Sequence, residues 1–331
     1  MARRLSSFQT LALWTTGTTY FLILVGGLVR ASGAGLGCPD WPRCFGGWIP
    51  PTSVDHLPAG FDPSQFNATL MWTEYLNRLL GVAVGLLILA TLVSAWRHHR
   101  QTPRIFWPTL AAFLLVGFQG WLGGVVVQQE LAAWIVTVHL VVALVIVSLL
   151  LYVTVYAFYA NRAGTHGAGT GRASCARPRR GDRPCMPAPA PRPLLAWSVG
   201  VLMVITLLQV IFGTQVREGI DHALAAGVPL ADALATVGRF DIWHREAALL
   251  IVAATVWVVW LVWTRHRADQ TLMRATAVLA ALVGAQVLLG ASMAYLTLTP
   301  SAQVAHLTGS SLLLGAETVL LLLARWLPAR G

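Results

Sequence analysis

The segment Asn77–His139, NRLLGVAVGLLILATLVSAWRHHRQTPRIFWPTLAAFLLVGFQGWLGGVVVQQELAAWIVTVH, occurs a second time in diverged form. A constant offset of 167 positions places its polar and glycine residues on the same or similar residues further along the chain. Matches in one register without a gap indicate a tandem duplication of a membrane bundle. The matched pairs are Asn77 with His244, Arg78 with Arg245, Gln119 with Gln286, Gly123 with Gly290, and His139 with His306.

The composition indicates a membrane protein. Of the 331 residues, 56% are hydrophobic and 11% are charged, which is too apolar for a water-soluble globule of this size. Apolar runs of about 20 residues can cross a hydrocarbon core of about 30 Å, and lipid leaves no water to satisfy the backbone, so these runs must be helices. We predict an all-α polytopic membrane protein with eight transmembrane helices, as two tandem four-helix bundles related by pseudo-two-fold symmetry. The predicted spans are roughly 10–29, 72–96, 105–127, 133–159, 194–213, 242–263, 275–296 and 303–326.

The chain divides into two predicted bundles and a linker. Residues 1–160 form the N-terminal bundle, with a long outer loop at 31–71, and residues 194–331 form the C-terminal bundle. Between them, 161–193 is rich in Gly, Pro, Ala and Arg without a hydrophobic period, which is typical of a disordered linker. The outer loop at 215–241 is predicted to be a partly helical interfacial segment.

Charge predicts the topology. All 23 basic residues are arginines, and most of them fall in loops on one side of the predicted spans. The positive-inside rule places that side, with both termini, in the cytoplasm. We predict a multi-pass protein of the cell's inner (plasma) membrane. The net charge of +10 then reflects topology and contact with membrane lipid, and nothing else in the sequence favours binding to nucleic acid.

Four cysteines fall in two different settings. Cys38 and Cys44 lie in the predicted outer loop, where the oxidising compartment favours either a stapling disulfide or a redox thiol pair. A C-x-x-C-H haem attachment motif is absent. Cys175 and Cys185 lie in the linker and are predicted to be free thiols.

Polar residues in the membrane helices form the predicted site. Asn77 and His139 in the first half, and His244 and His306 in the second, lie roughly 5–10 Å below the outer ends of parallel helices. Intramembrane ionisable residues are functional candidates, and two at one depth fit the axial ligands of a haem. Zinc would need further ligands, and a single histidine could instead only bond its neighbours. The duplicated glutamines are expected to hydrogen-bond across each bundle.

Four arginines lie where haem propionates would be. Arg78 and Arg245 adjoin the ligand positions, and Arg30 and Arg217 end helices on the same face. Guanidinium groups bind carboxylates in a fork geometry, so propionate binding is one interpretation. Snorkelling at the membrane interface is the other.

Acidic residues accompany these positions. Glu74 lies one helical turn before Asn77, and Asp241 holds the equivalent position in the second half. Glu74 is predicted to handle protons or orient a ligand, the alternative being a solvated helix cap. Glu317 has no counterpart, because Leu150 takes its place in the repeat, and the sequence suggests no function for it.

Several motifs resemble the haem A synthases of bacteria and mitochondria. The motifs are GGLVR at Gly26–Arg30, GAGL at Gly33–Leu36, CPDWP at Cys38–Pro42 and EYLNR at Glu74–Arg78, followed by the three histidines. The first motif is similar to GTQVR at the end of the fifth span, so the first span is expected to belong to the repeat rather than to a cleaved signal peptide. The resemblance covers the chain except the linker.

The resemblance implies an eight-helix duplicated bundle that oxidises the C8 methyl of haem O to a formyl group for haem-copper oxidases. His244 and His306 would hold a haem b cofactor. The first half would bind haem O, with His139 as ligand and Glu74 as an acid/base group. Cys38 and Cys44 would be the family's outer-loop redox pair or disulfide. Haem O synthase and oxidase assembly factors are the implied partners, and a homo-oligomer is left open.

Asn77 is a departure from the family, which usually has histidine at this position. The substrate haem would then be five-coordinate through His139 or would bind water on its open side, which suits oxygen activation. Glu74, His139 and Asn77 are therefore the candidate catalytic residues. The alternative function is haem-binding electron transfer or haem delivery with a catalytically silent N-terminal half. A transporter built on a repeat is less favoured, because the helices lack Gly/Pro breaks.

Overall fold

A computed structural model describes residues 5–167 and 192–325. Most of the predicted linker, with Cys175 and Cys185, lies outside the described residues. Eight of the described helices are long and apolar enough to cross a membrane, which confirms the predicted all-α architecture of eight spans. They are α1 Ser7–Ala31, α2 Ala68–His99, α3 Pro103–Gln128, α4 Ala133–Gly167, α5 Pro193–Ala225, α7 Arg239–Arg265, α8 Gln270–Tyr295 and α9 Pro300–Arg325, with a short α6 at Leu230–Ala233.

Local sequence signals define several helix starts. Ser6 and Gln9 form a reciprocal capping box at the start of α1. Asn67 accepts hydrogen bonds from the first backbone amides of α2, and Asp269 does the same for α8. Pro103 occupies the first position of α3, where the missing N–H costs nothing. Polar caps therefore mark the points where apolar helices begin.

The helix ends differ from the prediction in three places. Helix α5 continues to Ala225, so much of the predicted interfacial segment extends a transmembrane helix instead. Helix α4 continues to Gly167, into the range predicted as linker, and α2 begins at Ala68. The four candidate positions consequently lie between five and nine residues from their helix starts, or about 8–14 Å along the axis. This is somewhat deeper than predicted.

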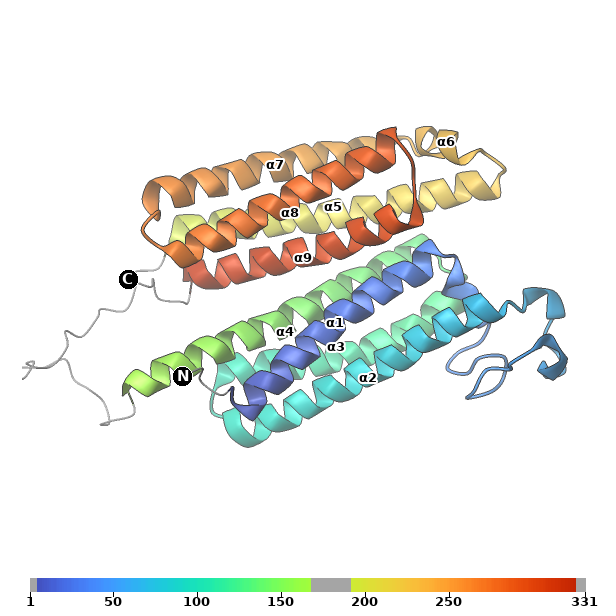
Figure 1. The fold of residues 1–331 in the computed structure, drawn as a ribbon, viewed down its shortest axis with the longest axis horizontal. Coiled ribbons are helices and arrows are strands. Elements are labelled where there is room, and N and C mark those ends of the chain that lie inside the picture. The colour runs from blue at the N-terminus through green and yellow to red at the C-terminus, as the bar shows by residue number, and fades with distance from the viewer. Residues whose placement is uncertain (1–4, 168–191, 326–331) are drawn as a thin grey trace, which may run out of the picture.

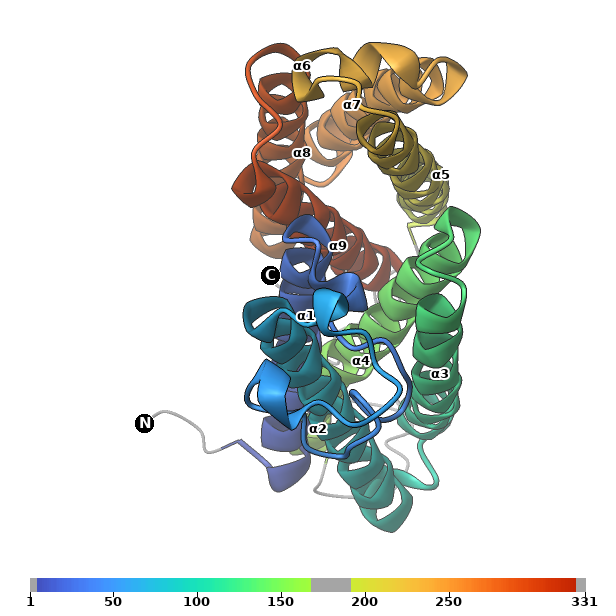
Figure 2. The ribbon, with the colours of Figure 1, turned by 90° about the vertical axis from the view of Figure 1, so that its right-hand side faces the viewer.

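The helices form two groups of four, α1–α4 and α5 with α7–α9, which lie side by side (Figures 1 and 2). Residues 32–67 and α6 lie at one end of the assembly, here termed the loop end, where α2, α4, α7 and α9 begin. Each helix packs against the corresponding neighbours in both groups, and the groups meet through α1 with α9, α4 with α5, and α4 with α9. The same packing pairs result when each helix is replaced by its counterpart in the other half. The two-fold relation itself stays a prediction.

Buried hydroxyl groups link the helices of the first half. The Thr15 and Thr91 hydroxyls lie 2.8 Å apart between α1 and α2, and those of Thr16 and Thr154 lie 2.8 Å apart between α1 and α4. Such bonds compensate for burying polar side chains where water is excluded. The outer faces carry exposed apolar side chains such as Leu288 of α8, at 73% exposure, which suits contact with lipid.

Candidate functional site

The second half brings two histidines together near the loop end. The ring centres of His244 in α7 and His306 in α9 are 6.4 Å apart, and the ring planes are inclined by 65°. Gln209 of α5 lies beside His244, whose Nδ1 is 3.2 Å from the Gln209 carbonyl oxygen and whose Nε2 is 3.4 Å from the amide nitrogen. The pair is thus held between three helices of one bundle.

The duplicated glutamines hydrogen-bond across each bundle, as predicted, and their partner is the histidine of the following helix. In the first half, Gln119 Nε2 donates to the carbonyl oxygen of His139 at 2.8 Å. In the second half, the amide orientation that satisfies every partner has Gln286 donating to the His306 carbonyl at 3.1 Å and to Nδ1 at 2.9 Å. Each glutamine therefore fixes the backbone that carries a candidate ligand.

A glycine lies beside each of the three rings. A Cβ atom added to Gly213 of α5 would be 3.0 Å from Cε1 of His244. An added Cβ at Gly123 would be 3.6 Å from Cε1 of His139, and the repeat position Gly290 has the same 3.6 Å distance to His306. The duplicated glycines therefore bring the backbone of one helix close to an imidazole of the next in both halves.

The first half contains buried polar atoms without partners. Neither Nδ1 of His139 nor Oδ1 of Asn77 has a hydrogen-bond partner among the described residues, and Oε1 of Gln119 also lacks one. Buried polar groups are normally satisfied by protein, water or a bound molecule. This group of atoms fits a ligand site on α2, α3 and α4.

Glu74 lies beneath the outer loop. Its side chain is buried and accepts a hydrogen bond from the Cys38 backbone amide at 2.8 Å. It also forms an ion pair with Arg78, one turn further along α2. Arg78 donates to the backbone oxygens of Asp40 at 2.7 Å, Arg43 at 2.9 Å and Cys38 at 3.2 Å. These two side chains of α2 therefore organise the loop.

The outer loop carries a disulfide between Cys38 and Cys44, whose Cα atoms are 4.8 Å apart. Between them, Asp40 accepts hydrogen bonds from the backbone amides of Phe45 at 2.6 Å and Gly46 at 2.9 Å. The Trp41 ring lies under the guanidinium of Arg78, 5.0 Å from its centre. The CPDWP motif is thus folded tightly against α2.

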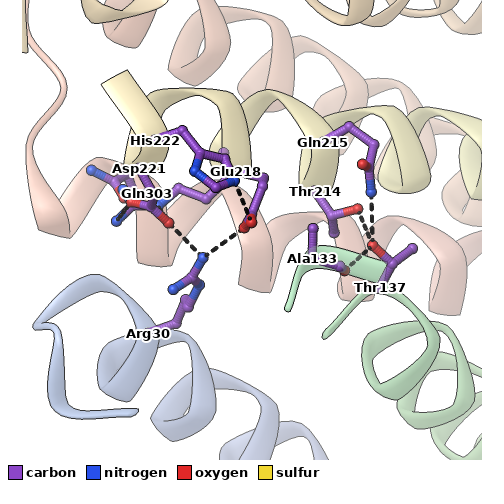
Figure 3. A network of polar contacts seen from close by, with 10 residues as sticks. Arg30, Ala133, Thr137, Thr214, Gln215, Glu218, Asp221, His222 and Gln303 are labelled. Atoms are coloured by element: carbon purple, nitrogen blue, oxygen red, sulfur yellow. Dashed lines mark hydrogen bonds and ion pairs between the residues drawn. The ribbon is translucent and has the colours of Figure 1, made fainter. Parts of the chain in front are cut away.

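A polar network joins the halves at the loop end (Figure 3). Arg30 of α1 donates to Asp221 of α5 at 2.5 Å and lies 3.7 Å from Glu218. Arg217 pairs with the same Asp221 at 2.8 Å and also donates to Gln303 of α9. Two guanidinium groups, one from each half, therefore share one carboxylate.

A second polar contact between the halves lies nearby. The hydroxyls of Thr137 in α4 and Thr214 in α5 are 2.7 Å apart, and Gln215 donates to Thr137 at 3.1 Å (Figure 3). Both contacts involve the loop-end part of α5, so this helix forms the polar seam between the bundles.

The fourth candidate arginine is more exposed. Arg245 pairs with Asp241 at 2.9 Å and lies 5.7 Å from the ring centre of Tyr295, with its side chain 45% exposed. All four candidate arginines thus bind carboxylates of the chain itself. Their predicted binding to haem propionates stays a prediction.

Sequence reasoning missed two residues of this region. Asp221 follows Arg217 by four positions, the spacing of an ion pair on one helix face. Gln209 is a polar residue within the apolar run of α5, and that contrast was the available signal. Their partners on other helices could not be read from spacing.

Residues 9–318 match the COX15-CtaA family, described as cytochrome oxidase assembly protein. The Heme A synthase of Shewanella oneidensis is 33% identical over 136 residues, which is 40% of each chain. That of Geobacillus kaustophilus is 30% identical over 155 residues, 46% of this chain and 44% of the relative, and that of Sinorhizobium fredii is 26% identical over 251 residues, 69% and 60%. The chain thus spans about two fifths to three fifths of these relatives' lengths. Because the family match extends over nearly the whole chain, this membrane protein belongs to the COX15-CtaA family of cytochrome oxidase assembly proteins.

Proposed function

We propose that the chain is a membrane oxidoreductase of the haem A synthase type, which converts the C8 methyl group of haem O to a formyl group. The observation that carries this proposal is the pair of histidines in the second half, whose spacing suits a haem. Membership of a family that includes proteins named Heme A synthase supports it. The product would serve haem-copper oxidase biogenesis.

The histidine pair passes a simple geometric test for haem. Two imidazole nitrogens about 2.0 Å from one metal, on opposite sides, leave the ring centres roughly 6 Å apart. The rings of His244 and His306 are 6.4 Å apart. When bound there, haem b would supply one-electron redox chemistry. Gln209 and Gln286 would fix the two rings by their contacts with ring nitrogens or the ligand backbone.

Arginines near the loop end would bind the propionates of the two haems. Arg30 and Arg217 already converge on one carboxylate, Asp221, which is the same chemical group as a propionate. Arg78 and Arg245 stand beside the ligand positions. A propionate would share or replace the present carboxylate partners.

We assign substrate binding to the first half. His139 would hold the substrate iron, and its unpartnered ring nitrogen supports this role. Asn77 is a poor iron ligand, so it would leave the opposite side open for water or oxygen. Glu74 would act indirectly, since its contacts are to Arg78 and the disulfide loop. Formation of a formyl group adds oxygen and removes hydrogen, so an electron acceptor is also required.

We further propose that the loop end faces the outside of the inner (plasma) membrane, with both termini in the cytoplasm. Arginines cluster in the two connections at the opposite end, α2–α3 and α7–α8, and the disulfide lies at the loop end. Haem O synthase and oxidase assembly factors are the proposed partners.

A second function follows from Asn77. If the open position does not support oxidation, the protein would transfer electrons or deliver haem, with a catalytically silent first half. The second half would bind haem b in the same way. The two functions differ only in what happens to haem O.

Co-expression with a haem O synthase distinguishes the two functions. Haem extracted from the purified protein should contain haem A, identified by mass and by the absorption of its formyl group. His139→Ala should abolish haem A and retain haem b, whereas His244→Ala should lose haem b. A folded wild-type protein that carries haem b and unmodified haem O would refute the synthase and leave the carrier.

A further inference from the structure

The second half contains a buried carboxylate that the proposed function does not use. The Glu317 side chain in α9 is fully buried and lies eleven residues after His306, about 16 Å further into the membrane. Its Oε1 accepts a hydrogen bond from the Thr206 hydroxyl of α5 at 2.7 Å, and its Oε2 has no partner. The equivalent position in the first half is Leu150, so this carboxylate belongs to one half only.

No cation of the described residues forms an ion pair with Glu317. The helices packed against α9 are α1, α4, α5 and α8. At this depth α1 contributes the Tyr20 phenol, which lies against Gly315, and α4 contributes Tyr152, which packs on the adjoining core. Helix α5 presents the neutral Thr206, and the charged residue of α8 nearest this depth, Arg274, is exposed on the helix surface. Among the described residues, Glu317 therefore bonds to a neutral hydroxyl and pairs with no cation.

A line of polar groups leads from Glu317 to the histidine pair. Thr206 and Gln209 lie three residues apart on α5 and thus on one face. The Gln209 carbonyl oxygen is 3.2 Å from Nδ1 of His244, and its amide nitrogen is 3.4 Å from Nε2. The groups Glu317, Thr206, Gln209 and His244 therefore follow one another toward the candidate haem ligands, with direct contacts between Glu317 and Thr206 and between Gln209 and His244.

This line includes two buried oxygens without partners, Oε2 of Glu317 and Oε1 of Gln209. Buried polar atoms are normally hydrogen-bonded to protein or to ordered water, so water molecules would complete the line. In the first half, Leu22 takes the place of Gln209 in the register that aligns GGLVR with GTQVR. The first half therefore lacks the counterparts of both Glu317 and Gln209, and the polar line is specific to the proposed haem b half.

We infer that Glu317 is a proton-binding site coupled to electron uptake at the histidine pair. His244 and His306 would hold the iron, and when a one-electron reductant supplied one electron there, Oε2 of the Glu317 carboxylate would take up one proton from the aqueous phase. It would return this proton to the aqueous phase on reoxidation. The proton balances the charge of the added electron in an interior of low dielectric constant. The inference rests on the proposed haem site.

The test is a spectroelectrochemical titration of the purified, haem-loaded full chain at a series of pH values. The wild-type midpoint potential should fall as the pH rises, by up to about 59 mV for each tenfold drop in proton concentration. Glu317→Gln keeps the shape and a partner for Thr206 and should remove this dependence. Thr206→Val keeps the carboxylate but should weaken the coupling. Glu130→Gln, in the exposed loop-end turn, is the matched control and should behave as wild type.

An infrared difference spectrum between the oxidised and reduced protein provides a second readout. Reduction should produce a protonated-carboxyl band, which Glu317→Gln should lack. Bis-histidine haem whose potential does not change with pH, or equal dependence in wild type and Glu317→Gln, would overturn the inference and leave the proposed function intact. Absence of haem at His244 and His306 would overturn both, and haem analysis separates these cases.

Discussion

Replacing Arg78 by Met should detach the disulfide loop from α2. The Arg78 and Glu74 side chains are 10% and 6% exposed, and Arg78 donates to three loop carbonyl oxygens besides Glu74. Removing one partner of a buried ion pair typically costs about 3–5 kcal/mol, because the other charge stays buried. Met retains most of the apolar stem, so the loss reflects the charge and the hydrogen bonds.

The repeat supplies a matched control. Arg245 holds the equivalent position and pairs with Asp241, but its side chain is 45% exposed. Exposed ion pairs contribute about 0.2–1 kcal/mol, so Arg245→Met should have a small effect. Adding Glu74→Gln to Arg78→Met should recover part of the loss, since no buried charge then remains.

Hydrogen exchange at the Cys38 amide, which donates to Glu74, measures the effect directly. A loss of about 3–5 kcal/mol corresponds to a roughly 100- to 5,000-fold decrease in protection. Protection that falls equally in Arg78→Met and Arg245→Met would refute the claim that burial of this network anchors the loop. So would a double variant that is less protected than Arg78→Met alone.

Three further predictions concern the haem sites and the seam between the halves. Gly213→Ala should reduce haem b content, because the added Cβ would lie 3.0 Å from Cε1 of His244. Gly200→Ala, in open space on the same helix, is the control and should bind haem normally. The ratio of haem to protein measures both variants. Asn77→His should convert the first-half haem to a six-coordinate low-spin species, seen by electron paramagnetic resonance, and an unchanged spectrum would exclude this residue from the iron. Asp221→Asn should lower the thermal stability by a few degrees, measured in a thermal scan, since both guanidinium groups lose their shared anion.

Hydropathy predicted the fold because lipid permits few architectures. The eight spans follow from apolar length, and the neighbour pattern within each half follows from the duplication. The helix ends were less predictable, because polar side chains of α5 such as Thr214, Arg217 and Asp221 bond to other helices at the seam between the halves. Arg217 and Asp221 extend α5 in this way, where the sequence alone favoured a separate segment.

The candidate site was predictable where the repeat preserves side chains. His244 and His306 were placed together from their register, and the structure brings their rings within 6.4 Å. The partners of Arg78 were not predictable, because backbone carbonyl oxygens leave no signature in the sequence. The contact between Arg30 and Asp221 forms where the two halves pack together. It was not predictable, because residues 191 positions apart share no local sequence pattern.

The Cys38 amide donates to Glu74, and Glu74 lies three residues before Asn77 on α2. The disulfide loop and the membrane-embedded helix are therefore connected through this hydrogen bond and the three that Arg78 donates to loop carbonyl oxygens. Reduction of the Cys38–Cys44 disulfide would loosen the loop, and Glu74 and Arg78 would then form other contacts. A redox change at the loop end would in this way alter the contacts of α2 at the entrance of the first bundle.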